Sequence, residues 1–307
     1  MRLRMNVITF SFAIGILLAA QASAASFFFS TTPPDGRLGA LSRPASPGKI
    51  ETETADDFLL EQTTVITGAT ITGLIPLGTP LDNIGQIEIE IYHIFPVDSA
   101  FPPSGNVPVR TNSPSDVEID GATRDSSRGT LSFGTTLLNA SFSVLNTVVN
   151  GINKVPQQNT LGEGSATGEE VEIEIDFTTP IILPPGHYFF RPEVLVTGGD
   201  FLYLSAVKPA VFPGTNTPDL QAWIRNSDLK PDWLRIGTDI IGGTTFDMSF
   251  SLIGDIVPEA GTPGEANCHG ITVSALSRQF RGMDGAASSF GSNVQALQRA
   301  VDLFCKP

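Results

Sequence analysis

Strict alternation of apolar and polar residues is the feature that most constrains the fold of this chain. It is clearest at 87–92 (I-E-I-E-I-Y), 171–177 (V-E-I-E-I-D-F) and 246–252 (F-D-M-S-F-S-L). Successive side chains of a β-strand point to opposite faces, so a period of two predicts strands with one buried and one solvated face. Further strands are expected at 64–75, 130–137, 186–196, 201–207 and 220–225.

Clusters of glycine and proline separate these predicted strands. They lie at 76–80, 102–105, 184–186 and 213–214. Glycine and proline favour tight turns and interrupt regular structure. Many short strands joined by turns, without helices between them, predict a mainly β fold. We expect an antiparallel β-sandwich of jelly-roll-like type over residues 25–256.

The first 24 residues have the pattern of a secretory signal peptide. Arg2 and Arg4 give a basic start, an apolar run covers 7–20, and A-S-A at 22–24 fits the small-x-small cleavage rule. We therefore predict export, to the periplasm or outside the cell. No later stretch reaches the roughly 20 apolar residues of a membrane helix, so no membrane span is expected.

The body of the chain is strongly acidic. Residues 25–267 hold 30 acidic and 12 basic side chains, a formal charge of −18. Such a charge repels nucleic acid and anionic lipid, so no nucleic-acid partner is expected. The negative charge favours the binding of cations, or it serves only to keep the protein soluble.

The pattern changes after the predicted sandwich. Residues 257–267, mostly P-E-A-G-T-P-G-E-A-N, have the composition of a linker. Residues 268–307 then show helical spacing of apolar residues and predict a small helical module. Within it, Ser292 and Gln295 form a capping-box pattern at the start of the last helix.

Cys268 and Cys305 are the only cysteines, and they bound this module. An even pair in an exported protein favours a disulfide bond. A metal site with His269 is the alternative, but it has too few ligands. A bond closing a loop of about 38 residues contributes roughly 4 kcal/mol on the chain-entropy model, in a module too small to bury much core.

Several stretches of the sequence resemble stretches of other exported bacterial proteins. P-D-G-R-L-G-A-L-S-R-P (34–44), E-T-A-D-D-F-L-L (53–60) and the run 221–237 resemble a group of uncharacterised secreted bacterial β-sandwich proteins. The tail, with C-H-G-I-T-V-S-A-L-S-R-Q-F (268–280) and V-Q-A-L-Q-R-A-V (294–301), is similar to a Cys-bounded helical module of exported bacterial proteins. The resemblance implies fold and export, and it brings no catalytic residues.

The stretch E-T-E-T-A-D-D-F-L-L (51–60) holds four carboxylates in seven residues. Strand parity puts Glu51, Glu53 and Asp57 on one face, which we expect to be solvated. Asp56 shares the parity of Phe58 and is expected to point inward. An inward carboxylate must be paired, hydrogen-bonded or bound to a metal. Asp56 therefore either caps backbone amides or joins a calcium site with acids from other strands.

The stretch D-V-E-I-D-G (116–121) is a second calcium candidate, because it imitates the start of an EF-hand loop. Its third position is Glu, and Ser127 stands where the loop needs a bidentate Glu. Val117 and Ile119 fit a strand equally well.

Signatures of common enzyme classes are absent from the sequence. It contains no H-E-x-x-H, no P-loop and no G-x-S-x-G. Of three histidines, His93 shares the parity of the neighbouring isoleucines and is expected in the core. A hydrolase whose two acids come from distant strands is still compatible with the sequence.

Two tryptophans fall on the polar face of their predicted strands, each two residues before an arginine. The residues on that face are Gln221, Trp223, Arg225, Trp233 and Arg235. A flat ring beside hydrogen-bonding groups is what a sugar platform requires. The alternative is that loops or the helical module cover the rings, with the arginines stacked on them.

These patterns favour an exported, non-catalytic β-sandwich protein with a binding or structural role at the cell surface or outside it. The expected partner is an extracellular glycan or a cell-surface component. Calcium is the candidate cofactor. The alternative is an extracellular polysaccharide hydrolase that uses a carboxylate pair.

Overall fold

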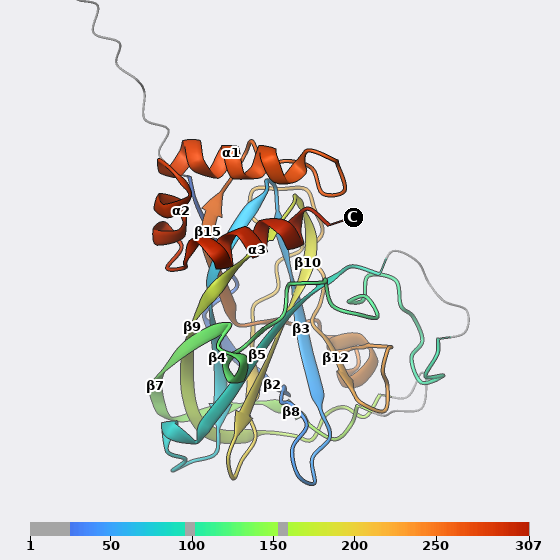
Figure 1. Cartoon of the computed structure of the whole chain (residues 1–307). Coiled ribbons are helices and arrows are strands. Elements are labelled where there is room, and N and C mark those ends of the chain that lie inside the picture. Colours follow the sequence, from blue (N-terminus) through green and yellow to red (C-terminus); the bar gives the residue numbers. More distant parts are fainter. Residues whose placement is uncertain (1–24, 96–101, 153–158, 307) are drawn as a thin grey trace, which may run out of the picture.

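Two β-sheets and three helices make up the part of the chain that the computed structural model describes, residues 25–95, 102–152 and 159–306. The predicted signal peptide lies outside these ranges. The helices gather at one end of the sheets (Figure 1). No helix in the described ranges is both long and apolar enough to cross a membrane.

The larger sheet carries the N-terminal strand at one end of its main path. In spatial order that path is β1 (Ser26–Ser30), β15 (Phe250–Ile256), β4 (Thr64–Ile75), β11 (Leu202–Ala206), β2 (Pro34–Leu41) and β8 (Asn146–Val148). Three strands branch from it: β14 (Asp247–Met248), β9 (Ala166–Leu183) and β7 (Leu131–Val144).

The smaller sheet has β3 near its centre. Its spatial order is β13 (Leu234–Arg235), β12 (Trp223–Asn226), β3 (Thr52–Leu60), β10 (Gly186–Val196), β5 (Ile84–His93) and β6 (Arg124–Asp125). Three short helical turns, η1 (Leu81–Asn83), η2 (Ser126–Arg128) and η3 (Ile236–Ile241), join strands.

The main core lies between the two sheets and uses the apolar positions of the alternating pattern. Ile87, Ile89 and Ile91 of β5 and Phe190 of β10 meet Ile71 of β4 there. Strands β3 to β5 and β9 to β12 alternate between the two sheets along the chain, whereas β7 and β8 precede β9 in the larger sheet. This alternation suits a jelly-roll-like sandwich, and the predicted mainly β fold is confirmed.

A second apolar layer covers the outer face of the smaller sheet. It contains Ala55, Tyr92, Phe189, Trp223 and Trp233, with partly buried residues from the connecting segments against them. The smaller sheet therefore has no solvated face along β3, where all residues but Leu59 are buried. This second layer decides the environment of every polar residue on that face.

The helical module packs against the sandwich rather than standing apart from it. Helices α1 (Cys268–Phe280), α2 (Met283–Ser289) and α3 (Val294–Phe304) share a core with Val65 of β4 and Ile182 of β9. The predicted disulfide is confirmed: Cys268 and Cys305 are bonded, with their Cα atoms 5.6 Å apart.

The predicted cap of the last helix is off by one residue. The carboxamide oxygen of Asn293 accepts a hydrogen bond from the Ala296 amide at 2.9 Å, so Asn293 is the N-cap of α3. The Ser292 hydroxyl instead donates to the Thr178 carbonyl oxygen at 2.8 Å. Asn293 therefore caps the helix, and the hydroxyl of Ser292 instead links the module to the sandwich.

Candidate functional site

Trp223 and Trp233 lie on the face that the sequence predicts, but both rings are buried, at 2% and 1% exposure. Trp233 meets Tyr92 edge to face at 5.5 Å, and its indole nitrogen donates to the Ser115 carbonyl oxygen at 3.4 Å. The two rings therefore do not form an exposed sugar platform. Segments outside the sheet cover them, and Arg225 stacks on Trp233, as in the alternative interpretation.

The polar residues predicted beside the rings are engaged elsewhere. Gln221 donates to the Thr238 hydroxyl at 2.9 Å. Arg235 pairs with Asp239 four residues on, at 2.7 Å between Nη2 and Oδ1. Arg225 pairs with Glu53 under the outer layer. The five residues are thus not gathered on one accessible surface.

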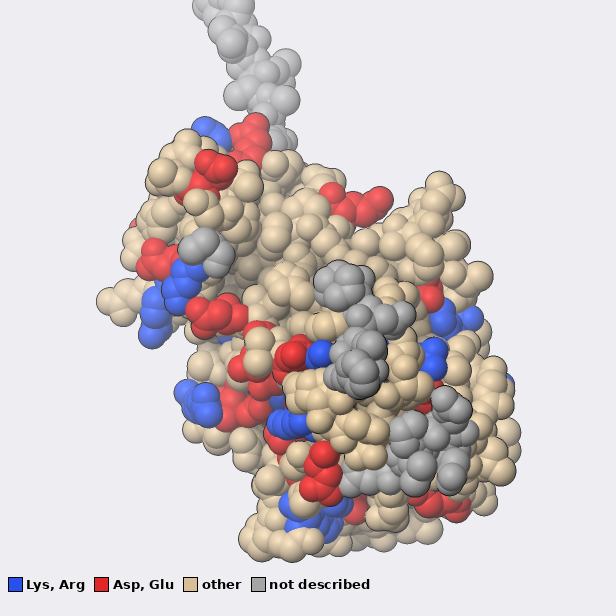
Figure 2. Space-filling model, turned by 90° about the vertical axis from the view of Figure 1, so that its right-hand side faces the viewer, with Lys and Arg blue, Asp and Glu red and all other residues tan. Residues whose placement is uncertain are grey.

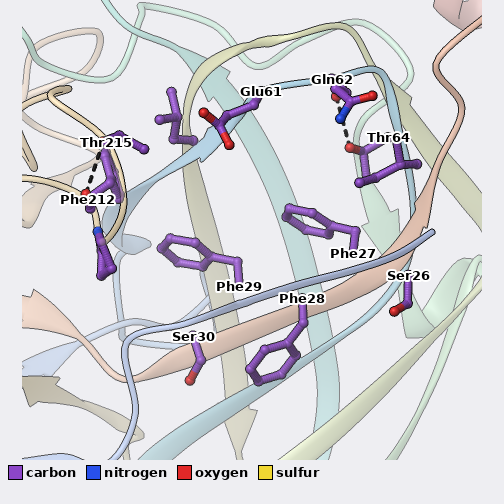
Figure 3. Close-up of a pocket in the computed structure, with 13 residues that line it drawn as sticks. Ser26, Phe27, Phe28, Phe29, Ser30, Glu61, Gln62, Thr64, Phe212 and Thr215 are labelled. Atoms are coloured by element: carbon purple, nitrogen blue, oxygen red, sulfur yellow. Dashed lines mark hydrogen bonds between the residues drawn. The ribbon is translucent and has the colours of Figure 1, made fainter.

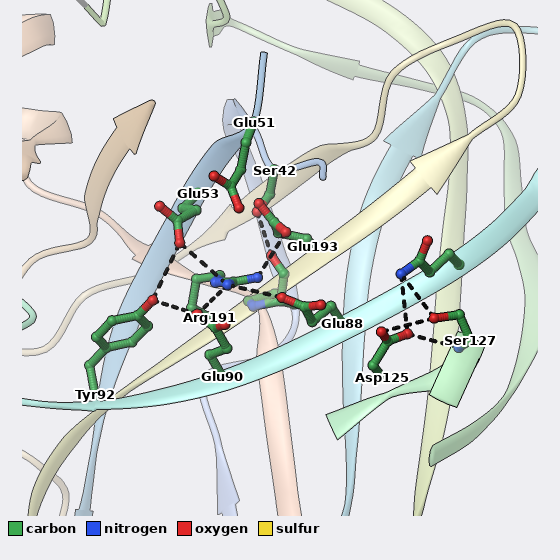
Figure 4. A network of polar contacts seen from close by, with 12 residues as sticks. Ser42, Glu51, Glu53, Glu88, Glu90, Tyr92, Asp125, Ser127, Arg191 and Glu193 are labelled. Atoms are coloured by element: carbon green, nitrogen blue, oxygen red, sulfur yellow. Dashed lines mark hydrogen bonds and ion pairs between the residues drawn. The ribbon is translucent and has the colours of Figure 1, made fainter. Parts of the chain in front are cut away.

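A network of charged side chains occupies the middle of the same outer face (Figure 4). Arg191 of β10 is 1% exposed and pairs with carboxylates from its own strand and from β3 and β5. Those carboxylates are Glu53, Glu88, Glu90 and Glu193. The Tyr92 hydroxyl donates to Glu90 and accepts from Arg225 at 3.0 Å.

The position of each carboxyl group in the network sets its pKa. Burial alone would raise the pKa of Glu53, but the charges of Arg191 and Arg225 hold it at about 2. Burial raises the pKa of Glu193 to about 8, because the attraction of Arg191 is offset by the neighbouring Glu53 and Glu51. Glu53 is therefore ionised at neutral pH, whereas Glu193 retains its proton.

The expectation of a solvated acidic face on β3 is wrong. Glu53 and Asp57 are buried, at 0% and 1% exposure, while Glu51 keeps part of its surface in water. Strand parity correctly placed Glu53 and Asp57 on the outer face of β3, but the second apolar layer covers that face. Buried carboxylates of this kind need partners, and arginines from other strands supply them.

Asp56 points inward as predicted and is fully buried. Its Oδ2 accepts a hydrogen bond from the Met248 amide at 2.7 Å, which matches the backbone-capping alternative. Its Oδ1 has no partner among the described residues. Burial, with Asp247 and Asp57 nearby, raises the pKa of Asp56, so it favours a proton.

Asp57 belongs to a second polar cluster. It lies on β3, just beyond the residues that pair with β12. His187 Nε2 lies 2.5 Å from Asp57 Oδ2, and the Leu220 amide donates to the same oxygen at 3.1 Å. Burial and the neighbouring Asp57 raise the pKa of Asp219 to about 6, although Lys208 lies 3.9 Å from it.

Asp247 completes this cluster. Burial and the neighbouring Asp219, with which Asp247 shares a side-chain hydrogen bond, raise the pKa of Asp247 to about 9. Two carboxyls with separated pKa values suit a hydrolase. Asp247 and Asp219 are only 1% and 8% exposed, however, so a sugar chain cannot reach between them.

The described residues contain one set of three carboxylates with ligand atoms close enough for a single metal ion, Glu51, Glu53 and Glu193. Asp56, the predicted calcium ligand, is not part of it. The EF-hand-like stretch does not close around a site either. Asp116 pairs with Arg110, and Asp120 pairs with Lys306 of the tail at 3.0 Å.

An open groove of about 470 Å³ lies beside β1. Phe27 and Phe29 of β1 point into it, while the ring of Phe28 points to the other side of the strand (Figure 3). Glu61 and Gln62, from the turn between β3 and β4, line the opposite wall. Strand parity separates the three rings of F-F-F at 27–29, but it gives no indication of the residues that complete the groove.

The segment 207–219 supplies a further wall of the groove. Phe212 packs edge to face on Phe29 at 5.9 Å and on His187 at 5.2 Å. The groove thus adjoins the cluster of Asp57 and His187 without opening into it, since Phe212 lies between them and is 4% exposed.

A larger cavity of about 660 Å³ lies between α3 and the sandwich. Leu303 and Phe304 line one side, and Ile181 and Leu183 of β9 line the other. His93 lies at this cavity and is exposed at the end of β5, so the expectation of a core histidine is wrong. The sheet ends at His93, where strand parity no longer determines burial.

Charged residues are mixed on the surface. On the face shown in Figure 2, Lys and Arg side chains lie beside Asp and Glu side chains rather than forming a basic patch of their own. The expectation, based on net charge, that nucleic acid is not a partner stays a prediction.

Comparison of the chain with family models, with curated proteins and with solved structures finds no match. The resemblance to secreted bacterial β-sandwich proteins therefore stays a prediction. The function has to be argued from the geometry of the grooves and clusters alone.

Proposed function

We propose that the protein is an exported, non-catalytic binding protein that holds a saccharide in the groove beside β1. The observation that carries this proposal is the pair of rings, Phe27 and Phe29, that face the groove opposite Glu61 and Gln62. The disulfide between Cys268 and Cys305 supports an oxidising location outside the cytoplasm.

The groove combines the two kinds of group that a sugar needs. Aromatic rings cover the C–H face of a sugar, and carboxylate, amide and hydroxyl groups bond its hydroxyls. The side chains of Glu61 and Gln62 form no hydrogen bond or ion pair with another described residue, so they are available to a ligand. Thr64 and Thr215 also line the groove, but their hydroxyls already donate to the carbonyl oxygens of Gln62 and Phe212.

The groove is better suited to binding a sugar than to hydrolysing a glycosidic bond. Glycoside hydrolysis by a carboxylate pair needs two carboxyl groups about 5–10 Å apart around the sugar. Among the described residues that line the groove, Glu61 is the only ionisable side chain. One carboxylate can orient a sugar hydroxyl, but it cannot serve as both acid and base.

Adjacent residues of β1 offer a matched pair of variants for the test. Phe27→Ala removes a ring that faces the groove and packs against the main core, whereas Phe28→Ala removes a lining residue whose ring is 69% exposed and points to the other side of the strand. Affinity electrophoresis against a panel of soluble polysaccharides would identify a ligand for the wild type. We expect Phe27→Ala to weaken its retention about tenfold, since a stacked ring contributes about 0.5–1.5 kcal/mol beyond the area it buries. Phe28→Ala should retain it.

Glu61→Gln separates the hydrogen-bonding role from the aromatic one. It keeps the size of the side chain and should weaken retention less than Phe27→Ala does. No retention of the wild type by any polysaccharide, or equal losses in Phe27→Ala and Phe28→Ala, would show that the groove is not a saccharide site.

A further inference from the structure

The network around Arg191 carries more negative than positive groups. Its ion pairs connect five carboxylates to three cations. The carboxylates are Glu51, Glu53, Glu88, Glu90 and Glu193, and the cations are Arg191, Arg225 and Lys230. With the proton that Glu193 holds at neutral pH, the network has an excess of one negative charge; with every group ionised, the excess is two, which one divalent cation would balance.

The excess is concentrated where three carboxylates converge. Ligand oxygens of Glu51, Glu53 and Glu193 all lie within 4.8 Å of one another. Calcium–oxygen distances are about 2.3–2.6 Å, so two oxygens on opposite sides of one ion are about 4.6–5.2 Å apart. The three side chains therefore fit around a single ion without rearrangement of the strands that carry them (Figure 4).

One ligand oxygen in this set lacks a partner. Glu193 is 1% exposed, and its Oε1 has no hydrogen-bond partner among the described residues. Its other oxygen contacts Arg191 at 2.9 Å. A buried carboxylate oxygen without a donor is costly, and a metal ion is one way to satisfy it.

We propose that Glu51, Glu53 and Glu193 form a site for a hard divalent cation, with calcium as the ligand. All three donors are carboxylate oxygens, which suit calcium, and the set offers no nitrogen or sulfur for zinc. The site is distinct from the predicted one at Asp56, and it does not depend on the groove beside β1.

Lys230 controls entry to this site. Its ammonium group lies 2.5 Å from Glu51 Oε2 and 3.5 Å from Glu53 Oε2. The side chains of Lys230 and Glu51 are 37% and 24% exposed, so the site opens to water on their side. The ammonium group occupies the neighbourhood that the cation would take and therefore competes with it.

Calorimetric titration of calcium into chelator-treated mature protein tests the proposal. We expect one ion per chain, with a dissociation constant in the range of about 10⁻⁴–10⁻³ M found for extracellular calcium modules. Glu51→Gln changes a partly exposed ligand and should weaken binding at least tenfold. Lys230→Met removes the competing charge and should strengthen binding by a similar factor.

Glu88→Gln is the matched control, because Glu88 belongs to the same network but not to the converging set. It should change calcium affinity less than threefold. Magnesium at equal ionic strength should bind more weakly, since it demands octahedral geometry. Circular dichroism of each variant confirms that it is folded.

The absence of calcium binding at 10 mM or above would overturn the proposal. So would calcium binding that is unchanged in both Glu51→Gln and Lys230→Met, since the ion would then bind elsewhere.

Discussion

The guanidinium carbon of Arg225 lies 4.2 Å from the centre of the Trp233 ring, while the same group pairs with Glu53. One arginine thus joins the aromatic outer layer to the buried carboxylates beneath it. A charged group stacked on an indole and bonded to a carboxylate can remain in a dry environment. The two tryptophans, which lie among the polar positions of their strands, therefore stabilise the fold by covering the ionic network.

Replacing Trp233 with alanine should destabilise the protein by about 3–5 kcal/mol, the usual cost of deleting a buried aromatic side chain. Urea unfolding followed by circular dichroism measures the change. Trp233→Phe keeps a ring under Arg225 and should lose much less. A loss below about 1 kcal/mol for Trp233→Ala would mean that the outer layer does not hold the ring in place.

Arg191→Met should cost about 3–5 kcal/mol, because it leaves buried carboxylates without their shared cation. Arg128→Met is the control. Arg128 is 73% exposed and lies 3.4 Å from Asp125, so its loss should cost no more than about 1 kcal/mol. Equal unfolding midpoints for the two variants would contradict the buried network.

Asp247 should make the protein less stable as pH rises. Its pKa is about 9 in the folded protein, raised by burial and Asp219, against an ordinary value of 3.8. Between these values the folded state holds a proton that the unfolded state releases. Stability from this group is therefore full below about pH 4 and is lost as pH rises towards 9.

Asp247→Asn isolates this effect, because asparagine keeps the shape and remains neutral at every pH. The difference in unfolding free energy between the variant and the wild type should shift in favour of the variant from pH 5 to pH 9. A difference for Asp247→Asn that does not change with pH would mean that Asp247 is ionised in the folded protein.

Removing the disulfide should loosen the helical module before the sandwich. The double variant Cys268→Ser with Cys305→Ser loses a constraint worth roughly 4 kcal/mol on the chain-entropy model. Hydrogen exchange should then rise in α1 and α3, while β3 and β10 keep their protection. Uniform exchange throughout the chain would instead show that the module and the sandwich unfold together.

The sequence predicts the strands well because their pattern is local. The expected ranges 64–75 and 186–196 coincide with β4 and β10. The inward direction of Asp56 and the pairing of Cys268 with Cys305 also follow from parity and composition. Each of these inferences uses only neighbouring residues or a single pair.

The site is harder to predict because it depends on what lies over each face. Parity separates Glu53 from Asp56, but it cannot show that a second apolar layer buries Glu53 as well. The groove needs Phe27, Glu61 and Phe212 from three distant segments. Only tertiary structure reveals that these residues meet.

The first strand of the sandwich pairs with the last, since Ser26 of β1 lies opposite Asp255 of β15. Contacts between distant segments form late, because the intervening chain must be ordered first. Phe27 and Phe29 therefore reach their final positions only when synthesis has delivered β15. The groove beside β1 cannot exist in a nascent chain that lacks β15, which couples any ligand binding there to the completion of folding.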